Sequence, residues 1–221
     1  MDTPKMEIHK KTIYTVLWVF AGLLLVASWW NAEGLIFFMA IIIFLYKERL
    51  ANSLHHSPLP LAFIGSGTIF GLFTELIRIL NNVGVPTAQK TLLHPNLAMD
   101  LLLGLFHYGM FTIAWYFILQ KRCFSKKAVF ILSGIFGLII TEKGLILGNV
   151  LFHPLSGFFL AFFGMGVYGI FPLCAYLLTE ERFPERPTPR AREYLTVLFC
   201  LFIVWAIYEN IFAEGVSIFF E

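Results

Sequence analysis

Charged residues are scarce in this chain, and their scarcity excludes a water-soluble globular protein. Only 14% of the 221 residues are charged and 58% are hydrophobic, whereas soluble domains contain about 25% charged residues. The three cysteines, Cys123, Cys174 and Cys200, have no CxxC spacing, so neither a disulfide framework nor a zinc site is expected. Motifs for phosphate, dinucleotide or nucleic-acid binding and a nucleophile elbow are also missing. The composition predicts one all-α integral-membrane domain over residues 1–221, with the lipid bilayer and no nucleic acid as its partner.

Seven apolar segments predict a polytopic membrane bundle of seven transmembrane helices. They are Thr12–Trp30, Gly34–Tyr46, Leu59–Asn81, Leu97–Leu119, Ala128–Val150, Ser156–Leu178 and Tyr194–Val216. A membrane-spanning helix needs about 20 apolar residues. The second segment is shorter than that, so a re-entrant segment is the alternative interpretation for it.

Lysine and arginine residues alternate between the predicted loops and so indicate the topology. Of the 16 such residues, 13 fall in the tail 1–11 and in the second, fourth and sixth loops, whereas the other loops contain only Lys90. Positive charge is enriched on the cytosolic side of membrane proteins. We therefore expect an integral plasma (inner) membrane protein with a cytosolic N-terminus and an external C-terminus. The basic loops fall on one side of the membrane only if all seven predicted segments cross it.

A long internal repeat relates the middle of the chain to itself. Segment Phe63–Leu80 matches Phe130–Leu147 at an offset of 67 residues, which aligns Glu75 with Glu142. The pair Tyr108-Gly109 recurs 60 residues later as Tyr168-Gly169. Predicted helices three–four and five–six would thus be duplicated hairpins, over about 60–122 and 127–182, with a partial third copy at 194–221. A two-span unit keeps its orientation, so this is a parallel pseudo-repeat.

The repeat places three carboxylates, Glu75, Glu142 and Glu209, at one depth on parallel helices. A charge at membrane depth costs about 2.5–3.5 kcal/mol, and intramembrane ionisable residues are functional by default. We expect the three to converge as catalytic acids and bases on the floor of a cavity open to the outside, with at least one protonated. The predicted substrate-binding residues are Arg78, Asn82, Asn149 and Asn210 in its walls, Asp100, His94 and His153 near its mouth, and His107.

Structural interpretations remain for each of these residues. Each Glu can be neutral or paired and simply hold helices together, and Arg78, three residues after Glu75, can neutralise it. His94 and His153 could be metal ligands, but the chain has no HxxxH, HExxH or ExxH spacing, so no metal is predicted. His107 also fits a hydrogen-bonded core histidine.

The best functional hypothesis is a membrane-embedded enzyme that acts on a lipid or isoprenoid by general acid/base chemistry. In size, helix number and intramembrane acids the chain is similar to small integral-membrane terpene cyclases, although it shares no motif with them. The alternatives are a small proton- or cation-coupled transporter or channel, and a non-catalytic membrane assembly subunit. The cytosolic halves of predicted helices three, five and seven are almost wholly apolar, which counts against a polar path across the membrane. The sequence indicates no particular cofactor.

Overall fold

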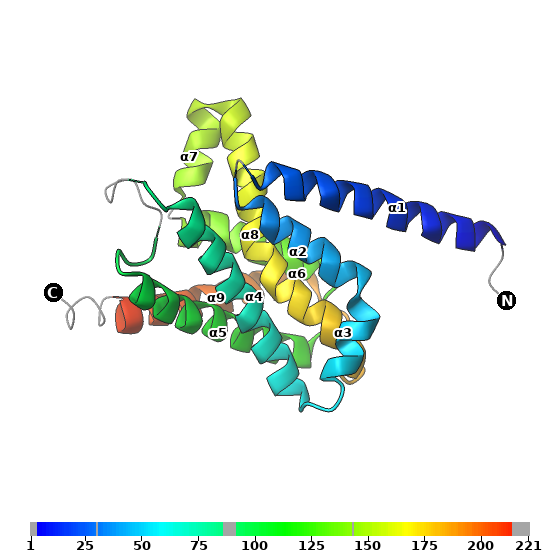
Figure 1. Ribbon diagram of the computed structural model, residues 1–221. Coiled ribbons are helices and arrows are strands. Elements are labelled where there is room, and N and C mark those ends of the chain that lie inside the picture. The colour runs from blue at the N-terminus through cyan, green and yellow to red at the C-terminus, as the bar shows by residue number, and fades with distance from the viewer. Residues whose placement is uncertain (1–3, 30, 86–91, 143, 214–221) are drawn as a thin grey trace.

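The computed structural model describes residues 4–29, 31–85, 92–142 and 144–213, and these residues form helices and no strands (Figure 1). The predicted all-α class is confirmed. The helices in chain order are α1 (Pro4–Ala27), α2 (Gly34–Leu45), α3 (Lys47–Leu54), α4 (Leu59–Asn81), α5 (Leu97–Lys121), α6 (Lys126–Phe136), η2 (Gly137–Thr141), α7 (Leu145–Phe152), α8 (Pro154–Thr179), η3 (Glu180–Arg182), α9 (Ala191–Tyr208) and η4 (Glu209–Ala213).

Four helical segments among the described residues are long and apolar enough to cross a membrane. They are Leu59–Asn81, Leu97–Lys121, Pro154–Arg182 and Ala191–Phe212. A fifth span results if the bent pair formed by α6–η2 and α7 counts as one crossing. Two further apolar helices, Lys11–Ala27 and Gly34–Leu45, are shorter. These lengths and compositions support a multi-pass membrane protein with four or five candidate spans, and the seven-span arrangement stays a prediction.

The fifth predicted helix, Ala128–Val150, is not one straight helix. The chain bends by 88° between Lys126–Thr141 and Leu145–Phe152. Before the bend, the helix widens into a π-turn in which the Glu142 N–H donates to the Gly137 carbonyl over 3.0 Å. At the bend, Gly144 has a φ of 72°, a left-handed conformation that favours glycine. The sequence stays apolar on both sides of the bend, so the apolar pattern alone predicted a continuous helix.

Arginine side chains gather three of the loops at one end of the bundle. Arg182 donates to the carbonyl of Leu54, the last residue of α3, over 3.0 Å, and to that of Ser57 in the connection from α3 to α4. Arg186, between α8 and α9, donates to the carbonyl of Leu119 near the end of α5. Together with the adjoining helix ends, this end of the bundle carries ten of the 16 lysines and arginines, and we call it the basic end.

An aromatic core fills the half of the bundle next to the basic end. Phe63 from α4, Trp115 from α5 and Phe171 from α8 are almost wholly buried there. Phe124 and Phe183, from the loops at the basic end, close the same cluster. The polar side chains described below lie farther along α4, beyond this core.

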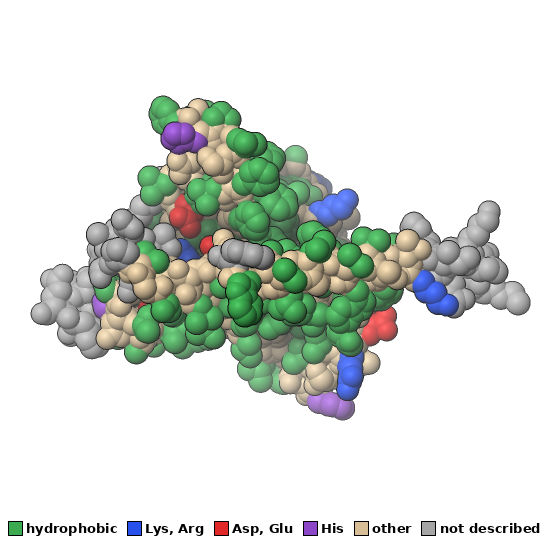
Figure 2. All heavy atoms as spheres, turned by 45° about the horizontal axis from the view of Figure 1, so that its top comes forward, with side chains coloured by type: hydrophobic (Ala, Val, Ile, Leu, Met, Phe, Trp, Pro, Cys, Tyr) green, Lys and Arg blue, Asp and Glu red, His purple; other side chains and the backbone are tan. Residues whose placement is uncertain are grey.

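Two parts of the chain project from the bundle (Figure 1). One is α1, which extends away from the other helices. The other is a hairpin formed by α7 and the first turns of α8, whose side chains Leu151, Phe152 and Leu155 are highly exposed. Hydrophobic side chains cover much of the face seen in Figure 2. An apolar exterior of this kind suits lipid rather than water.

Candidate functional site

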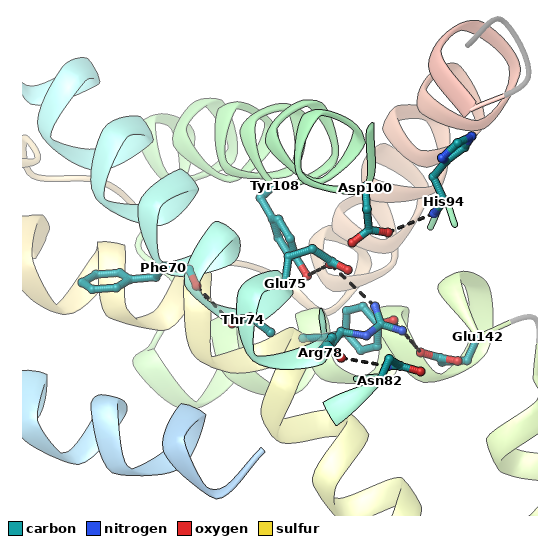
Figure 3. Close-up of polar contacts among 10 residues, drawn as sticks. Phe70, Thr74, Glu75, Arg78, Asn82, His94, Asp100, Tyr108 and Glu142 are labelled. Carbon is teal, nitrogen blue, oxygen red and sulfur yellow. Dashed lines mark hydrogen bonds and ion pairs between the residues drawn. The ribbon is translucent and has the colours of Figure 1, made fainter. Parts of the chain in front are cut away.

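The centre of the candidate site is Arg78, which lies between two repeat-related glutamates (Figure 3). Its Nη1 is 3.8 Å from Glu75 Oε2, and its Nη2 is 4.0 Å from Glu142 Oε1. Glu75 and Arg78 are one turn apart on α4, whereas Glu142 ends the π-turn η2. Two of the three predicted acids therefore meet at one arginine.

These three charged side chains differ in how far they are exposed to their surroundings. The Glu75 side chain is 0% exposed, that of Arg78 17% and that of Glu142 27%. Acidic and basic atoms are visible at the foot of the α7–α8 hairpin in Figure 2, on a face that is otherwise largely hydrophobic. Glu142 is therefore the accessible acid of the pair, and Glu75 is fully buried.

Each glutamate accepts a hydrogen bond from a tyrosine of the following long helix. Tyr108 Oη on α5 donates to Glu75 Oε2 over 3.0 Å, and Tyr168 Oη on α8 donates to Glu142 Oε1 over 2.6 Å. Sequence reasoning left both tyrosines out of the site. Their 60-residue offset was the available signal, but the neighbouring glycines favoured an interpretation as helix packing.

A glycine on the glutamate's helix makes room for each tyrosine ring. A Cβ added at Gly71 would lie 2.2 Å from the Tyr108 ring, and one at Gly137 would lie 2.1 Å from the Tyr168 ring. Gly71 precedes Glu75 by four residues, whereas Gly137 precedes Glu142 by five. The π-turn compensates for the extra residue, because its hydrogen bond runs from Glu142 to Gly137. Both glutamates therefore lie one helical turn beyond the glycine under their tyrosine.

Asp100, a predicted mouth residue, instead lies buried beside Glu75. Its Oδ1 accepts the backbone N–H of His94 over 2.9 Å, and its carboxyl group is close enough to that of Glu75 for their charges to interact. Neither Asp100 Oδ2 nor Glu75 Oε1 receives a donor from the described residues. Two ionised carboxylates are both acceptors, so a hydrogen bond between these groups requires a proton on one of them.

His107 and Tyr208 form an aromatic wall next to the buried acids. The His107 ring is 5.1 Å from that of Tyr108 and 4.9 Å from that of Tyr208. The Tyr208 hydroxyl is close enough to Glu75, Asp100 and Glu209 to interact with their charges. Glu209 itself is partly exposed at the start of η4. Its convergence with the other two glutamates within about 10 Å stays a prediction.

Four predicted binding residues take other places. Asn82 ends α4, and its side-chain amide donates to the Arg78 carbonyl over 2.8 Å. Asn210 is exposed, and its amide donates to the carbonyl of Ala206 in its own helix. Asn149 and His153 are exposed on the far side of the 88° bend. Asn149 therefore lies beyond the bend from Glu142, and the Asn210 side chain bonds to its own backbone; the predicted wall of asparagines stays a prediction.

The histidines show no metal-binding arrangement in the described ranges. His94 Nδ1 accepts the backbone N–H of Asn96 over 2.9 Å, and Asn96 caps the first turn of α5. His153 lies between α7 and α8 as the residue that ends one helix and precedes the other. No three His, Cys, Asp or Glu side chains in those ranges are grouped as a metal ion would need.

Glu33, between α1 and α2, is a further acid near the site that sequence reasoning did not select. Burial raises the pKa of its carboxyl above the usual 4.5, while the charge of Arg78 partly offsets this and that of Glu142 adds to it. The loop is fixed to the end of α4, because the Asn81 side chain accepts the Ala32 N–H over 2.8 Å and donates to Asn31 over 3.0 Å. No periodic pattern in the sequence marks this contact.

Comparison with protein-family models, curated proteins and solved structures finds no match for the chain. Function must therefore be inferred from the site itself. In this site two carboxylates share an arginine, each accepts a hydrogen bond from a tyrosine, and Glu142 is the more exposed of the two.

Proposed function

We propose that the protein is a membrane-embedded enzyme that acts on a lipid or isoprenoid substrate by general acid/base chemistry at Glu142. The observation that carries this proposal is the pairing of a partly exposed acid with a fixed arginine and a fixed tyrosine. Tyr168 and Arg78 both approach Glu142 Oε1, and no donor among the described residues approaches Oε2. Oε2 is therefore the atom that carries a proton to, or accepts one from, the substrate.

Glu75, Asp100 and Tyr108 are the support for that acid. All three are buried; Tyr108 donates to Glu75, Glu75 is paired with Arg78, and Asp100 lies beside Glu75, so they hold the guanidinium in place. Buried charge networks of this type lock side chains in one geometry, which general acid catalysis requires. Glu209 is the third acid of the proposed site, where it would act beside Tyr208.

The aromatic core supports an enzyme over a transporter. Phe63, Trp115 and Phe171 are each at most 3% exposed and lie on the basic side of the acids. A transported ion or proton needs a polar path through the whole membrane, and these buried rings make the surface there predominantly apolar. A site that opens to one side of such a core fits a reaction on a membrane-dissolved substrate.

We also propose the seven-span topology, with the basic end in the cytosol, for this enzyme. The meeting of Arg122, Arg182 and Arg186 at one end supports it, since positive charge is enriched on the cytosolic side. Two equivalent glutamate–tyrosine pairs support the duplication of the hairpins as a parallel repeat. The acids would then face the outer half of the bilayer.

The test is conversion of host-membrane lipids by the purified protein in nanodiscs made up in D2O. A general acid that protonates a substrate carbon transfers one deuteron from solvent, so mass spectrometry should show a product with added deuterium. Glu142→Gln keeps the shape of the neutral acid but has no proton to give, so it should remain folded and lose about 10²–10⁴-fold in rate. Glu181→Gln, an exposed carboxylate at the basic end, is the matched control.

Other results assign the protein to another class. Movement of protons into proteoliposomes by the wild type but not by Glu142→Gln, without any product, would make it a transporter. A Glu142→Gln protein with full activity would refute the general-acid proposal. Helix packing would then be the better account of the cluster.

A further inference from the structure

A groove with a volume of about 600 Å³ lies between α5 and α9, apart from the acid cluster. Its walls are apolar, and include Ala114, Phe117 and Ile118 from α5 and Ile203 and Val204 from α9. Its charged lining residues, Lys121, Arg122 and Glu193, all lie at the basic end. The groove thus has an apolar body and one charged mouth.

Positive charge is in excess at this mouth. Glu193 is fully engaged: Oε1 accepts from Arg122 Nε over 2.6 Å and Oε2 from the Arg190 backbone N–H over 2.6 Å. Arg122 Nη1 donates to the Lys121 carbonyl over 3.1 Å, which leaves Nη2 without a partner in the described structure. The exposed Lys121 ammonium has no carboxylate partner there either. The mouth can therefore still bind an anion.

The length of the groove matches one leaflet of a bilayer. From Glu193 at the mouth to Val204, α9 advances eleven residues, or about 16 Å at 1.5 Å per residue. Half of a hydrocarbon core of about 30 Å is about 15 Å. An acyl chain whose headgroup is at the mouth would end where the groove ends.

The packing of α9 leaves a place for such a chain. Among its residues only Val197, Leu201 and Tyr208 are buried. The helix is fixed at the basic end by the Arg122–Glu193 ion pair and by the edge contact of Tyr194 with Phe124, whose rings are 5.3 Å apart. Between this anchor and Tyr208, the α5-facing side of α9 borders the groove.

We propose that this groove is a binding site for an anionic phospholipid of the leaflet at the basic end. Its phosphate lies against the Lys121 ammonium and the free Arg122 Nη2, and one acyl chain runs between α5 and α9. The bound lipid supplies the contact that α9 otherwise lacks. This site is separate from the acid cluster and does not depend on the reaction proposed there.

Native mass spectrometry of the purified full-length protein tests the proposal, with phosphatidylglycerol and phosphatidylcholine offered in equal amounts. The wild type should retain one phosphatidylglycerol in preference to phosphatidylcholine. Lys121→Ala should weaken that retention about fivefold, as expected for one interfacial lysine. Lys127→Ala, an equally exposed lysine on α6 that does not line the groove, should leave it unchanged.

A second pair of variants tests the apolar body. Ile203 and Ile207 are both 42% exposed on α9, but only Ile203 lines the groove. Ile203→Trp should fill the groove and remove the bound lipid, and Ile207→Trp should not. The proposal is overturned if the wild type retains no lipid, if both lysine variants or both tryptophan variants behave alike, or if a dimer replaces the lipid adduct, which would assign the groove to a second copy.

Discussion

The two glutamate–tyrosine pairs make the same contact in different surroundings. Glu75 and Tyr108 meet on a straight helix with no exposure, whereas Glu142 and Tyr168 meet at a π-turn where the glutamate is 27% exposed. Arg78 serves both. The difference teaches that a repeated pattern can preserve a contact in two environments, one buried and one accessible, and the proposed function assigns support to the first and reaction to the second.

Removal of the shared partner should have the largest effect. Arg78→Met leaves Glu75 without its cation in a buried setting, so the free energy of unfolding should fall by about 3–5 kcal/mol. Lys126→Met is the control, because it removes a 2.6 Å ion pair with Glu180 between partly exposed groups, and should cost about 0–1 kcal/mol. Chemical denaturation in detergent measures both. Equal losses of unfolding free energy in the two variants would mean that the ion pairs of Arg78 contribute no more than a pair at the protein surface.

Filling the space under a tyrosine should come next. Gly71→Ala brings a Cβ to 2.2 Å from the Tyr108 ring, so the ring must shift and stability should fall by about 1–3 kcal/mol. Gly65→Ala, on the same helix with nothing within 4 Å of the new Cβ, should be neutral or slightly stabilising. Thermal unfolding in detergent compares them. If the two variants unfold at the same temperature, the tyrosine is not held against this glycine.

The tyrosine hydroxyls should then separate the two pairs. Tyr108→Phe strands a buried carboxylate oxygen and should cost about 1.5–3 kcal/mol, because hydrogen bonds to charged groups are of that size. Tyr168→Phe should cost less, since water can reach the partly exposed Glu142, but it should lower the rate of the proposed reaction. Denaturation in detergent and the deuterium assay measure the two effects. A larger stability loss for Tyr168→Phe would reverse the roles given to the two pairs.

The smallest effect concerns Glu33 and pH. Burial raises the pKa of its carboxyl above 4.5, so the folded state favours the protonated form. The stabilisation from that proton is complete below pH 4.5 and is lost as pH rises through the folded pKa. Glu33→Gln stays neutral, so its stability relative to the wild type should improve as pH rises from about 4 to about 8. A constant difference between the two proteins over this range would contradict the raised pKa.

The sequence was sufficient for the helical class and for the association of Glu75 with Glu142, because a charge that recurs at a fixed offset within apolar segments indicates a shared environment. It was also sufficient to place Arg78 beside Glu75. It did not predict the bend before Asn149, because hydropathy does not record the left-handed conformation of Gly144. It missed Tyr108 and Tyr168, because a tyrosine beside a glycine in a membrane helix fits helix packing equally well.

The π-turn at Gly137–Thr141 determines the direction in which the Glu142 side chain points around the helix axis. Each residue of an α-helix turns the chain by about 100°, so an extra residue between Gly137 and Glu142 would point the carboxylate away from Tyr168 in a regular helix. The wider turn absorbs that angle, and the hydroxyl still meets the acid at 2.6 Å. A residue-for-residue alignment of the two halves pairs Gly71 with Leu138, whereas the contacts pair Gly71 with Gly137.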